Sequence, residues 1–455
     1  MAYFYPDEGK LWKVVKEEVK RQGFYSRVGF RVVLPAQRGV RSCEVHALMP
    51  FADRLWVATG WGGAGLYEVD EDFTVKPRDE GVPGDNFGRA YHRELDVAVI
   101  GAHVVHPDRV RRHGVPPAYA FTYRDDRTLF AVGFDGRVEW LNPVTLEHSH
   151  VTDVPRGAYP AHIPRCRDAV FKAGRLYVAC ARQYPDYDVG LQYYDTATGA
   201  WVKVSDGVFH ALWTDYEWGW GNPLYAFGHD ELSALMLVTR DGARFSRYRL
   251  PKSRPDFDYS DSCQWRARRV ASYSALAYVH GTFYEIPNFN FAGVKGMLGA
   301  VIVRPVSTTL WNIFDFAPFV GMLAVGRSEL FPPEGNSVGG QPQSGLDMFR
   351  LEDLWSFGRP RGYGGMWKDT SVSAGEVSDP FLIHGFDVKT LHLWTDTPGT
   401  FTVEVDPVGD GTWKTYDTVT FSAAGYDKYI VTGDAVWLRV SFDRAARVGA
   451  WLNLR

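Results

Sequence analysis

The segment YHRELDVAVIGAHVVH places three histidines, His92, His103 and His106, on and around one strand-like apolar run. An imidazole titrates near neutral pH, so it can transfer protons, and its neutral form binds metals. Other segments carry single histidines: His46 in CEVHALMP, His162 in AHIPR, His210 in VFHALW and His280 in YVHGTFYEI. A reactive centre and a metal site therefore compete with the simpler interpretation, in which each histidine is hydrogen-bonded between strands.

The histidines lie in a unit that recurs over most of the chain. It consists of a short apolar run, a turn with Gly, Asp or Asn, a second apolar run and a polar link, as in TLFAVGFDGRVEWLNPVT. About seven such units of roughly 40 to 50 residues match the period of propeller blades. Runs such as LYVACA are apolar on both faces, as expected for blades that pack against two neighbours. Because blades are related by rotation, we expect at least three of His46, His92, His103, His162 and His280 to face one cavity.

The hydrophobic pattern changes near Asp379. From there, segments such as KTLHLWTD and AVWLRVSFD alternate more regularly between apolar and polar residues. This alternation, with Asp-Gly and Pro-Gly turns, is typical of a small β-sandwich. The segment DEGKLWKVVKEEVKRQG has an amphipathic helical pattern. We therefore predict an all-β protein: an N-terminal helical extension over residues 1–24, a seven-bladed β-propeller over 25–372 and an antiparallel β-sandwich over 379–455.

Composition narrows the possible partners. A net charge of -4 without long single-sign runs argues against nucleic acid and anionic membranes, and no apolar run is long enough to span a bilayer. The amino terminus lacks the apolar region of a secretory signal. As it stands, the sequence predicts a cytoplasmic protein, or a secreted one if a leader has been removed.

The four cysteines have no zinc-site spacing. We expect Cys166 and Cys180 to be buried thiols, although the hairpin that they flank could bring them together.

Cations accompany the histidines at Arg89, Arg93, Arg165, Arg167, Arg266, Arg268 and Arg269. A guanidinium binds a carboxylate with two parallel hydrogen bonds, so this combination suits an anionic substrate. Arginines that pair with loop carboxylates are the alternative for each one taken singly. The motifs HExxH and GxSxG and a P-loop do not occur. Paired carboxylates of the glycosidase type are possible at Glu44, Asp168 and Asp230, but their spacing does not single them out.

Longer segments carry a resemblance to a family. FGRAYHRELDVAVIGAHVV, AHIPRCRDAVFKAGRLYVACA, QWRARRVASYSALAYVHGTFYEIP and FTVEVDPVGDGTWKTYDTV resemble mostly uncharacterised bacterial seven-bladed propellers with a C-terminal β-sandwich. Those proteins are more distantly similar to propeller enzymes that remove L-rhamnose linked α-1,4 to glucuronic acid, by hydrolysis or β-elimination, with channel histidines. The sequence departs from that pattern at HALWTDYEWGWG and CQWRARR, which leaves the substrate open.

The resemblance implies a glycan-processing enzyme, either a polysaccharide lyase or a glycoside hydrolase, that acts on an acidic oligosaccharide or polysaccharide. We expect His92 and His103 to divide the acid and base roles, joined by His46 and His162. The predicted substrate-binding residues are Arg93, Arg165, His210, Arg266, His280 and Tyr284. No cofactor is firmly predicted, although a divalent cation bound by histidines is possible. The other alternative is a non-catalytic propeller that binds a glycan or protein.

Overall fold

The computed structural model describes residues 30–33, 43–61, 65–80, 87–156, 164–180, 189–214, 223–253, 266–271, 274–287, 301–309, 313–327 and 345–455. The helix expected over residues 1–24 lies outside these ranges, as does His162. The chain divides into two compact units. The first contains Met1–Leu212, Asp261–Val270 and Trp311–Ser356, and the second contains Trp213–Ser260, Ala271–Leu310 and Phe357–Arg455.

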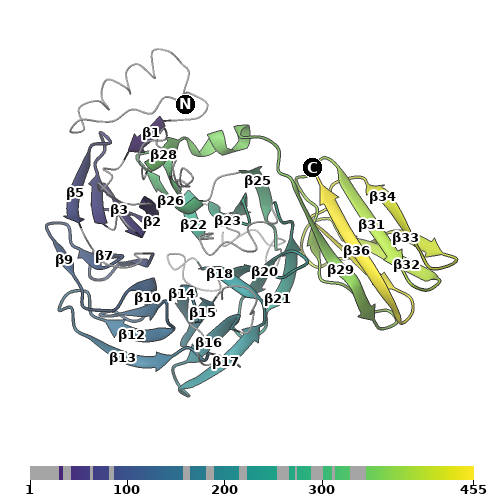
Figure 1. Ribbon diagram of the computed structural model, residues 1–455, viewed down its shortest axis with the longest axis horizontal. Helices are drawn as coiled ribbons and strands as arrows, with labels where there is room; N and C mark the ends of the chain where they lie inside the picture. Colours follow the sequence, from purple (N-terminus) through teal and green to yellow (C-terminus); the bar gives the residue numbers. More distant parts are fainter. Residues whose placement is uncertain are drawn as a thin grey trace, which may run out of the picture. The chain divides into compact units, whose positions relative to one another are not determined.

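Four sheets of the first unit are built from strands that follow one another along the chain and pair with antiparallel neighbours (Figure 1). The first sheet contains β2 (Cys43–Phe51), β3 (Arg54–Trp61), β4 (Gly65–Val69) and β5 (Val75–Glu80), and the second contains β6 (Arg89–His92), β7 (Val97–Ile100), β8 (His103–Val105) and β9 (Val110–Arg112). The third sheet contains β10 (Ala118–Tyr123), β11 (Leu129–Gly133), β12 (Arg137–Leu141) and β13 (His148–Asp153). The fourth contains β14 (Cys166–Lys172), β15 (Arg175–Cys180), β16 (Leu191–Asp195) and β17 (Ala200–Ser205).

A fifth sheet of this unit joins segments that are far apart in the sequence. Its order is β1 (Phe30–Val33), β28 (Gly345–Phe349), β27 (Met322–Arg327) and β26 (Ile313–Phe319), and β1 pairs antiparallel with β28. The unit also contains the short 3-10 helix η2 (Leu351–Ser356) and all but the last residue of β18 (Val208–Trp213) and β22 (Arg266–Ala271).

Both faces of these sheets are buried, as β7 shows. Ala98 and Ile100 pack with Ala47 and Trp56 of the preceding sheet, whereas Val97 and Val99 pack on the other side with Leu129 and Ala131 of the following sheet. Successive side chains of a strand point to opposite faces, so one four-residue run joins two neighbours. Full burial of one such aliphatic side chain contributes about 1.5 to 3 kcal/mol.

The second unit contains two further blade-like groups of strands and the sandwich. The groups are β19 (Leu224–His229), β20 (Ala234–Thr239) and β21 (Ser246–Leu250), and β23 (Ser274–Val279), β24 (Thr282–Pro287) and β25 (Arg304–Thr308). Together with the four-stranded antiparallel sheets of the first unit, these groups confirm the predicted propeller-like, all-β fold class. The count of seven blades stays a prediction.

The sandwich has two sheets that enclose one apolar core. One has the order β29 (Gly362–Val372), β36 (Ala446–Leu454), β31 (Lys389–Thr395) and β34 (Gly425–Val431), and the other has β30 (Phe381–Leu382), β35 (Trp437–Phe442), β32 (Gly399–Asp406) and β33 (Lys414–Phe421). The sandwich therefore includes β29, which begins before the expected boundary at residue 379.

The second sandwich sheet continues from a blade-like sheet of the same unit. β30 pairs in parallel with β21 at Phe381 and Arg249, and the Arg249 side chain, 5% exposed, donates hydrogen bonds to Asp230 and Asp379. A buried guanidinium with two carboxylate partners holds this junction in one register.

In the described ranges, no helix has the length and apolar character that crossing a membrane requires.

Candidate functional site

Four strands of the first unit that each stand at one edge of their sheet contain a β-bulge at a similar position. The pairing register shifts between Val45 and Ala47 in β2, Ala118 and Ala120 in β10, Cys166 and Asp168 in β14, and Ile313 and Asp315 in β26. The residues left out of register are His46, Tyr119, Arg167 and Phe314. A bulge redirects the side chain of its extra residue, and bulges are common next to functional sites.

These side chains gather around Phe87, which precedes β6. The His46 imidazole stacks on the Phe87 ring with centroids 3.7 Å apart, and the Tyr119 and Phe314 rings lie 4.6 Å and 6.1 Å from it. The Arg167 guanidinium lies 5.5 Å from the Tyr119 ring centroid. We call His46, Phe87, Tyr119, Arg167 and Phe314 the bulge cluster. It brings together side chains from the neighbouring strands β26, β2, β10 and β14 and from the segment before β6.

Two carboxylates next to the bulges join edge strands of neighbouring sheets, β14 to β18 and β26 to β2, by the same kind of contact. Asp168 accepts hydrogen bonds from its neighbour Ala169 and from Leu212 of β18, at 3.0 and 2.9 Å. Asp315 accepts them from Phe316 and from Leu48 of β2, at 2.9 and 2.7 Å. Burial raises the pKa of both carboxyl groups, while nearby arginines, Arg266 for Asp168 and Arg89 for Asp315, act in the opposite direction.

Arginines surround the two carboxylates. Arg89 and Arg268 pair with Asp315 at 3.0 and 3.3 Å, and Arg268 also donates to the Leu48 carbonyl at 2.8 Å. Arg266 is only 1% exposed and donates to the carbonyls of Phe87 and Arg167. Burial, and then the charge of Arg89, lower the pKa of Arg266 to about 10, so it stays charged at neutral pH.

The Arg266 side chain has capacity for a further acceptor. Among the described residues its buried Nε atom has no hydrogen-bond partner. Three guanidinium groups, of Arg89, Arg266 and Arg268, lie near the carboxylates of Asp168 and Asp315, and Arg167 adds to the positive potential at Arg266. A buried cation is stable only when its charge is balanced, so this arrangement suits an anionic ligand.

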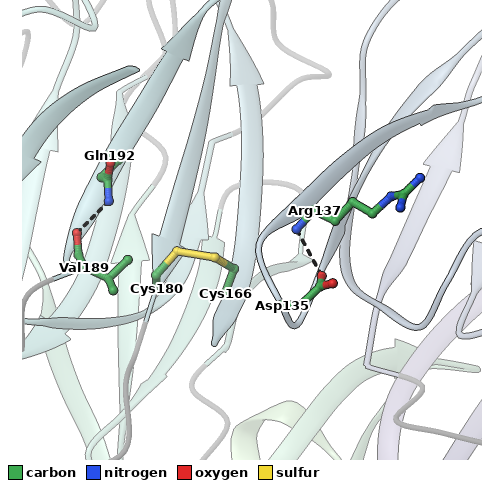
Figure 2. The surroundings of a disulfide bond; sticks show 6 residues. All are labelled: Asp135, Arg137, Cys166, Cys180, Val189 and Gln192. Atoms are coloured by element: carbon green, nitrogen blue, oxygen red, sulfur yellow. Dashed lines mark hydrogen bonds between the residues drawn. A yellow bond between two sulfur atoms is a disulfide. The ribbon is translucent and has the colours of Figure 1, made fainter. Parts of the chain in front are cut away.

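A disulfide lies beside the bulge that carries Arg167. Cys166 and Cys180 are opposite each other on β14 and β15 and are joined through their sulfur atoms, which corrects the expectation of two buried thiols (Figure 2). On the β16 side of this hairpin, Gln192 donates a hydrogen bond to the Val189 carbonyl at 2.9 Å. The cross-link holds the strand at the residue before Arg167 and thereby fixes where the bulge begins.

The predicted catalytic histidines have different surroundings. His46 belongs to the bulge cluster. His92 ends β6, and its Nε2 lies 2.9 Å from the Asp125 carbonyl oxygen in the turn after β10. His103, in β8, has its Nε2 2.8 Å from the Asp79 carboxylate, and its pKa is lowered by burial despite that contact. His92 and His103 therefore contact turn and outer-strand residues.

The predicted substrate-binding residues are also divided between several places. Arg266 lies beside the bulge cluster, and His210 is buried in β18, two residues before Leu212, just as His46 stands two residues before Leu48. Arg165 lies 5.1 Å from the Phe134 ring, which stacks on Tyr119. Arg93 is exposed in the turn after β6. At about 3.3 Å per strand residue, Arg93 is about 13 Å from Arg89 along the chain.

His280 and Tyr284 belong to the second unit. His280 Nδ1 accepts a hydrogen bond from the Ser253 amide at 3.2 Å, and the Tyr284 hydroxyl donates to the Pro251 carbonyl at 3.3 Å. Both side chains are buried, so they help to fix the segment after β21 against β23 and β24.

In the described part of the chain, no group of three or more His, Cys, Asp or Glu side chains is arranged to hold a metal ion.

Sequence reasoning missed Asp315 and the aromatic members of the cluster, Phe87, Tyr119 and Phe314. A signal was present in CRDAVF and IFDFAP, where an aspartate follows the bulge residue and precedes an apolar one. A second signal was the repeat of His-Ala-Leu in VHALM and FHALW, which marks His46 and His210 as equivalent.

Comparison with known proteins gives similarity at the level of fold. No protein-family model matches the chain, and no curated protein matches it. Similar solved structures include the β-propeller domain of Cps50 (Swd1) from Myceliophteria thermophila, 12% identical, covering 69% of this chain and 98% of that one with a TM-score of 0.42. The WD40 propeller domain of Doa1 is 11% identical, covering 72% and 99%, with a TM-score of 0.42. A chain of the mitotic checkpoint complex is 9% identical, covering 77% and 99%, with a TM-score of 0.45.

Proposed function

We propose that this protein cleaves acidic glycans next to a uronic acid, and that the bulge cluster with its surrounding arginines is the site. The observation that carries the proposal is Arg266, a buried guanidinium with a free Nε donor in the described part of the chain, attached through the Phe87 carbonyl to the residue on which His46 stacks. A uronate carboxylate offers two oxygens in one plane, which matches the guanidinium fork.

Each residue has a separate role in this proposal. Arg266 binds the carboxylate and, with Arg89, stabilises the negative charge that develops when the neighbouring C5 proton is removed. His46 takes that proton. The bond from C4 to the departing oxygen then breaks, a C4–C5 double bond forms, and His210 protonates the departing oxygen. In the hydrolytic alternative, a water molecule adds across the bond that breaks and no double bond forms.

The assignment moves the acid–base roles from His92 and His103 to His46 and His210. His92 and His103 have their Nε2 atoms engaged with the Asp125 carbonyl oxygen and the Asp79 carboxylate, and Asp79 also pairs with Arg112. Such contacts suit structural histidines. His46 and His210 each stand two residues before a leucine whose amide donates to a buried aspartate, Asp315 or Asp168, and arginines lie near both aspartates. Matching positions of this kind suit a pair that shares one substrate.

The test is a screen of uronate oligosaccharides, including rhamnosyl-α-1,4-glucuronate, read by product mass and by the ultraviolet absorbance of an unsaturated uronate. An unsaturated product identifies elimination, and a mass gain of one water identifies hydrolysis. We expect His46→Gln to lower kcat/KM by about 100-fold to 10,000-fold, the usual range for general acid or base catalysis. His92→Gln and His103→Gln should stay within about tenfold of the parent on that scale, with reduced thermal stability.

Two arginine variants separate charge from geometry. Arg266→Met removes the charge and Arg266→Lys keeps it without the planar fork. Both should raise KM and lower kcat, and the lysine variant should recover only part of the loss. Arg93→Ala, in an exposed turn, is the matched control and should behave as the parent. Binding of the oligosaccharide without any turnover would contradict the enzymatic proposal and favour a non-catalytic glycan-binding propeller.

A further inference from the structure

The outward face of the sandwich sheet β29-β36-β31-β34 carries a row of aromatic rings. The opposite face of this sheet supplies Leu391, Leu393, Ala450 and Leu452 to the sandwich core. Residues of the other parity point outward: Trp394 is paired with Tyr426 of β34, and Trp451 lies between His392 of β31 and Gly365 of β29. Tyr426 is 59% exposed, although aromatic side chains are usually buried.

Glycines on neighbouring strands let the two indole rings lie over the sheet. A Cβ atom at Gly449, the cross-strand partner of Trp394, would overlap the Trp394 indole. A Cβ atom at Gly365, the partner of Trp451, would overlap the Trp451 indole in the same way. Both rings therefore cover a bare stretch of backbone. The Tyr363 ring is within 19° of parallel to Trp451, at a centroid distance of 6.3 Å.

Polar groups link these rings. His392 Nδ1 lies 2.8 Å from the Tyr426 hydroxyl, and its Nε2 lies 3.0 Å from the Asn453 side-chain amide nitrogen. An amide NH₂ group only donates, so Nε2 accepts and Nδ1–H donates to Tyr426, as assigned from this hydrogen-bond network. The Tyr426 hydroxyl hydrogen is then available to a ligand. We call Tyr363, His392, Trp394, Tyr426, Trp451 and Asn453 the aromatic platform.

One cation of this face, Lys428, points outward beside His392. Lys428 is exposed, is paired with His392 across β31 and β34, and has no ion-pair partner in the part of the chain that the structure describes. Arg447, at the edge of the face, pairs with Asp369. Flat rings with neutral hydrogen-bonding groups match a pyranose, which has an apolar C–H face and a rim of hydroxyls, and Lys428 matches a carboxylate on it.

We propose that the aromatic platform is a second glycan-binding site, which holds an acidic polysaccharide chain by ring stacking and by Lys428. The choice of an acidic glycan rests on the proposed function, whereas the stacking surface stands on its own geometry. The two sites have different tasks: the bulge cluster acts on the bond that is cleaved, and the platform retains the polymer. Platform variants should therefore lose affinity for long chains and keep activity on short oligosaccharides.

The test is affinity electrophoresis of the full chain through gels that contain β-1,4-polyglucuronate or, as the neutral polymer of the same linkage, hydroxyethylcellulose. We expect polyglucuronate to retard the parent protein more than hydroxyethylcellulose does. Trp394→Ala and Trp451→Ala should each weaken binding by at least about tenfold, as loss of an aromatic anchor does at binding hot spots. Lys428→Ala should abolish the preference for the acidic polymer.

Trp413→Ala is the matched control, since Trp413 belongs to the sandwich but packs 4.0 Å from the Arg439 guanidinium instead of contributing to the platform. It should migrate as the parent does, and thermal melting should show that all variants are folded. A parent that polyglucuronate does not retard, or retards no more than the neutral polymer, would overturn the proposal. Equal retardation of the parent and the two tryptophan variants would overturn it too. Cleavage of a short uronate oligosaccharide, measured in parallel, tests the proposed function separately.

Discussion

The imidazole of His46 and the phenyl ring of Phe87 lie in stacked contact, with centroids 3.7 Å apart and an interplanar angle of 18°. The contact depends on Gly60, which lies behind the imidazole on β3, because a Cβ atom at this position would overlap the ring. A glycine outside the cluster thus fixes the position of a residue inside it.

We predict that Gly60→Ala displaces His46 and lowers kcat/KM by about tenfold or more while the protein stays folded, because small misplacements of catalytic groups are costly. Overpacking a buried site also costs about 1 to 3 kcal/mol of stability. Gly425→Ala is the matched control, since the nearest atom to its Cβ would be 3.7 Å away, an ordinary contact. If Gly60→Ala has the parent's kinetics, His46 is not held as the structure indicates.

Asp315 should be a main source of stability in the first unit. Its buried carboxylate accepts hydrogen bonds from two backbone amides and pairs with Arg89 and Arg268. Asp315→Asn leaves two guanidiniums without this counter-ion and should destabilise the protein by about 3 kcal/mol or more, measured as a lower urea midpoint.

The exposed pair of Asp369 and Arg447 provides the comparison for Asp315. Their side chains are 64% and 56% exposed, so Asp369→Asn should cost less than about 1 kcal/mol. Similar losses for the two variants would contradict the buried network.

The disulfide between Cys166 and Cys180 should stabilise the β14–β15 hairpin. The two cysteines are 14 residues apart, and closing a loop of that length contributes about 3 kcal/mol in the chain-entropy account. Under non-reducing conditions the Cys166→Ala/Cys180→Ala variant should melt at a lower temperature than the parent. Dithiothreitol should lower the melting temperature of the parent and leave that of the variant unchanged. A parent insensitive to the reductant would contradict the pairing.

Mild acid should destabilise the protein through His113. Burial lowers the pKa of this histidine from 6.5 to about 4, and its Nε2 lies 2.9 Å from the Gly101 carbonyl oxygen. The unfolded chain takes up the proton below about pH 6.5 while the folded protein does not until about pH 4, so stability falls as the pH drops through this window.

Between pH 7.5 and 4.5, the loss from His113 alone is about 2.5 kcal/mol. Urea unfolding at the two pH values measures it. His113→Gln should show a correspondingly smaller change, and a variant with the same pH dependence as the parent would refute the assignment.

Local patterns in the sequence predicted the sheets well and the site only in part. The run VAVI is apolar at every position because β7 is covered on both sides. Its composition therefore predicted correctly a strand that packs against two neighbouring sheets. The bulges left only a short signal, the aspartate after the bulge residue in CRDAVF and IFDFAP. A bulge inserts one residue and so changes the direction of a side chain, but it leaves the composition of the strand unchanged. The partner of His103, Asp79, lies in a different sheet, and no period in the sequence specifies such a pair. The regular alternation of apolar and polar residues predicted the sandwich correctly. It did not predict β29, because glycines such as those in GYGGMWKD are uncommon in strands.

The pairing of β1 with β28 has a consequence for synthesis on the ribosome. Residues 30–33 leave the ribosome more than 300 residues before their partners, residues 345–348. At about 5 to 20 residues per second, β1 waits roughly 15 to 60 seconds for the strand that it completes. Until β28 is made, β1 has no strand to pair with, and unpaired strand edges promote aggregation. Slow translation or a nascent-chain chaperone should therefore change the yield of this protein more than that of one whose sheets close locally.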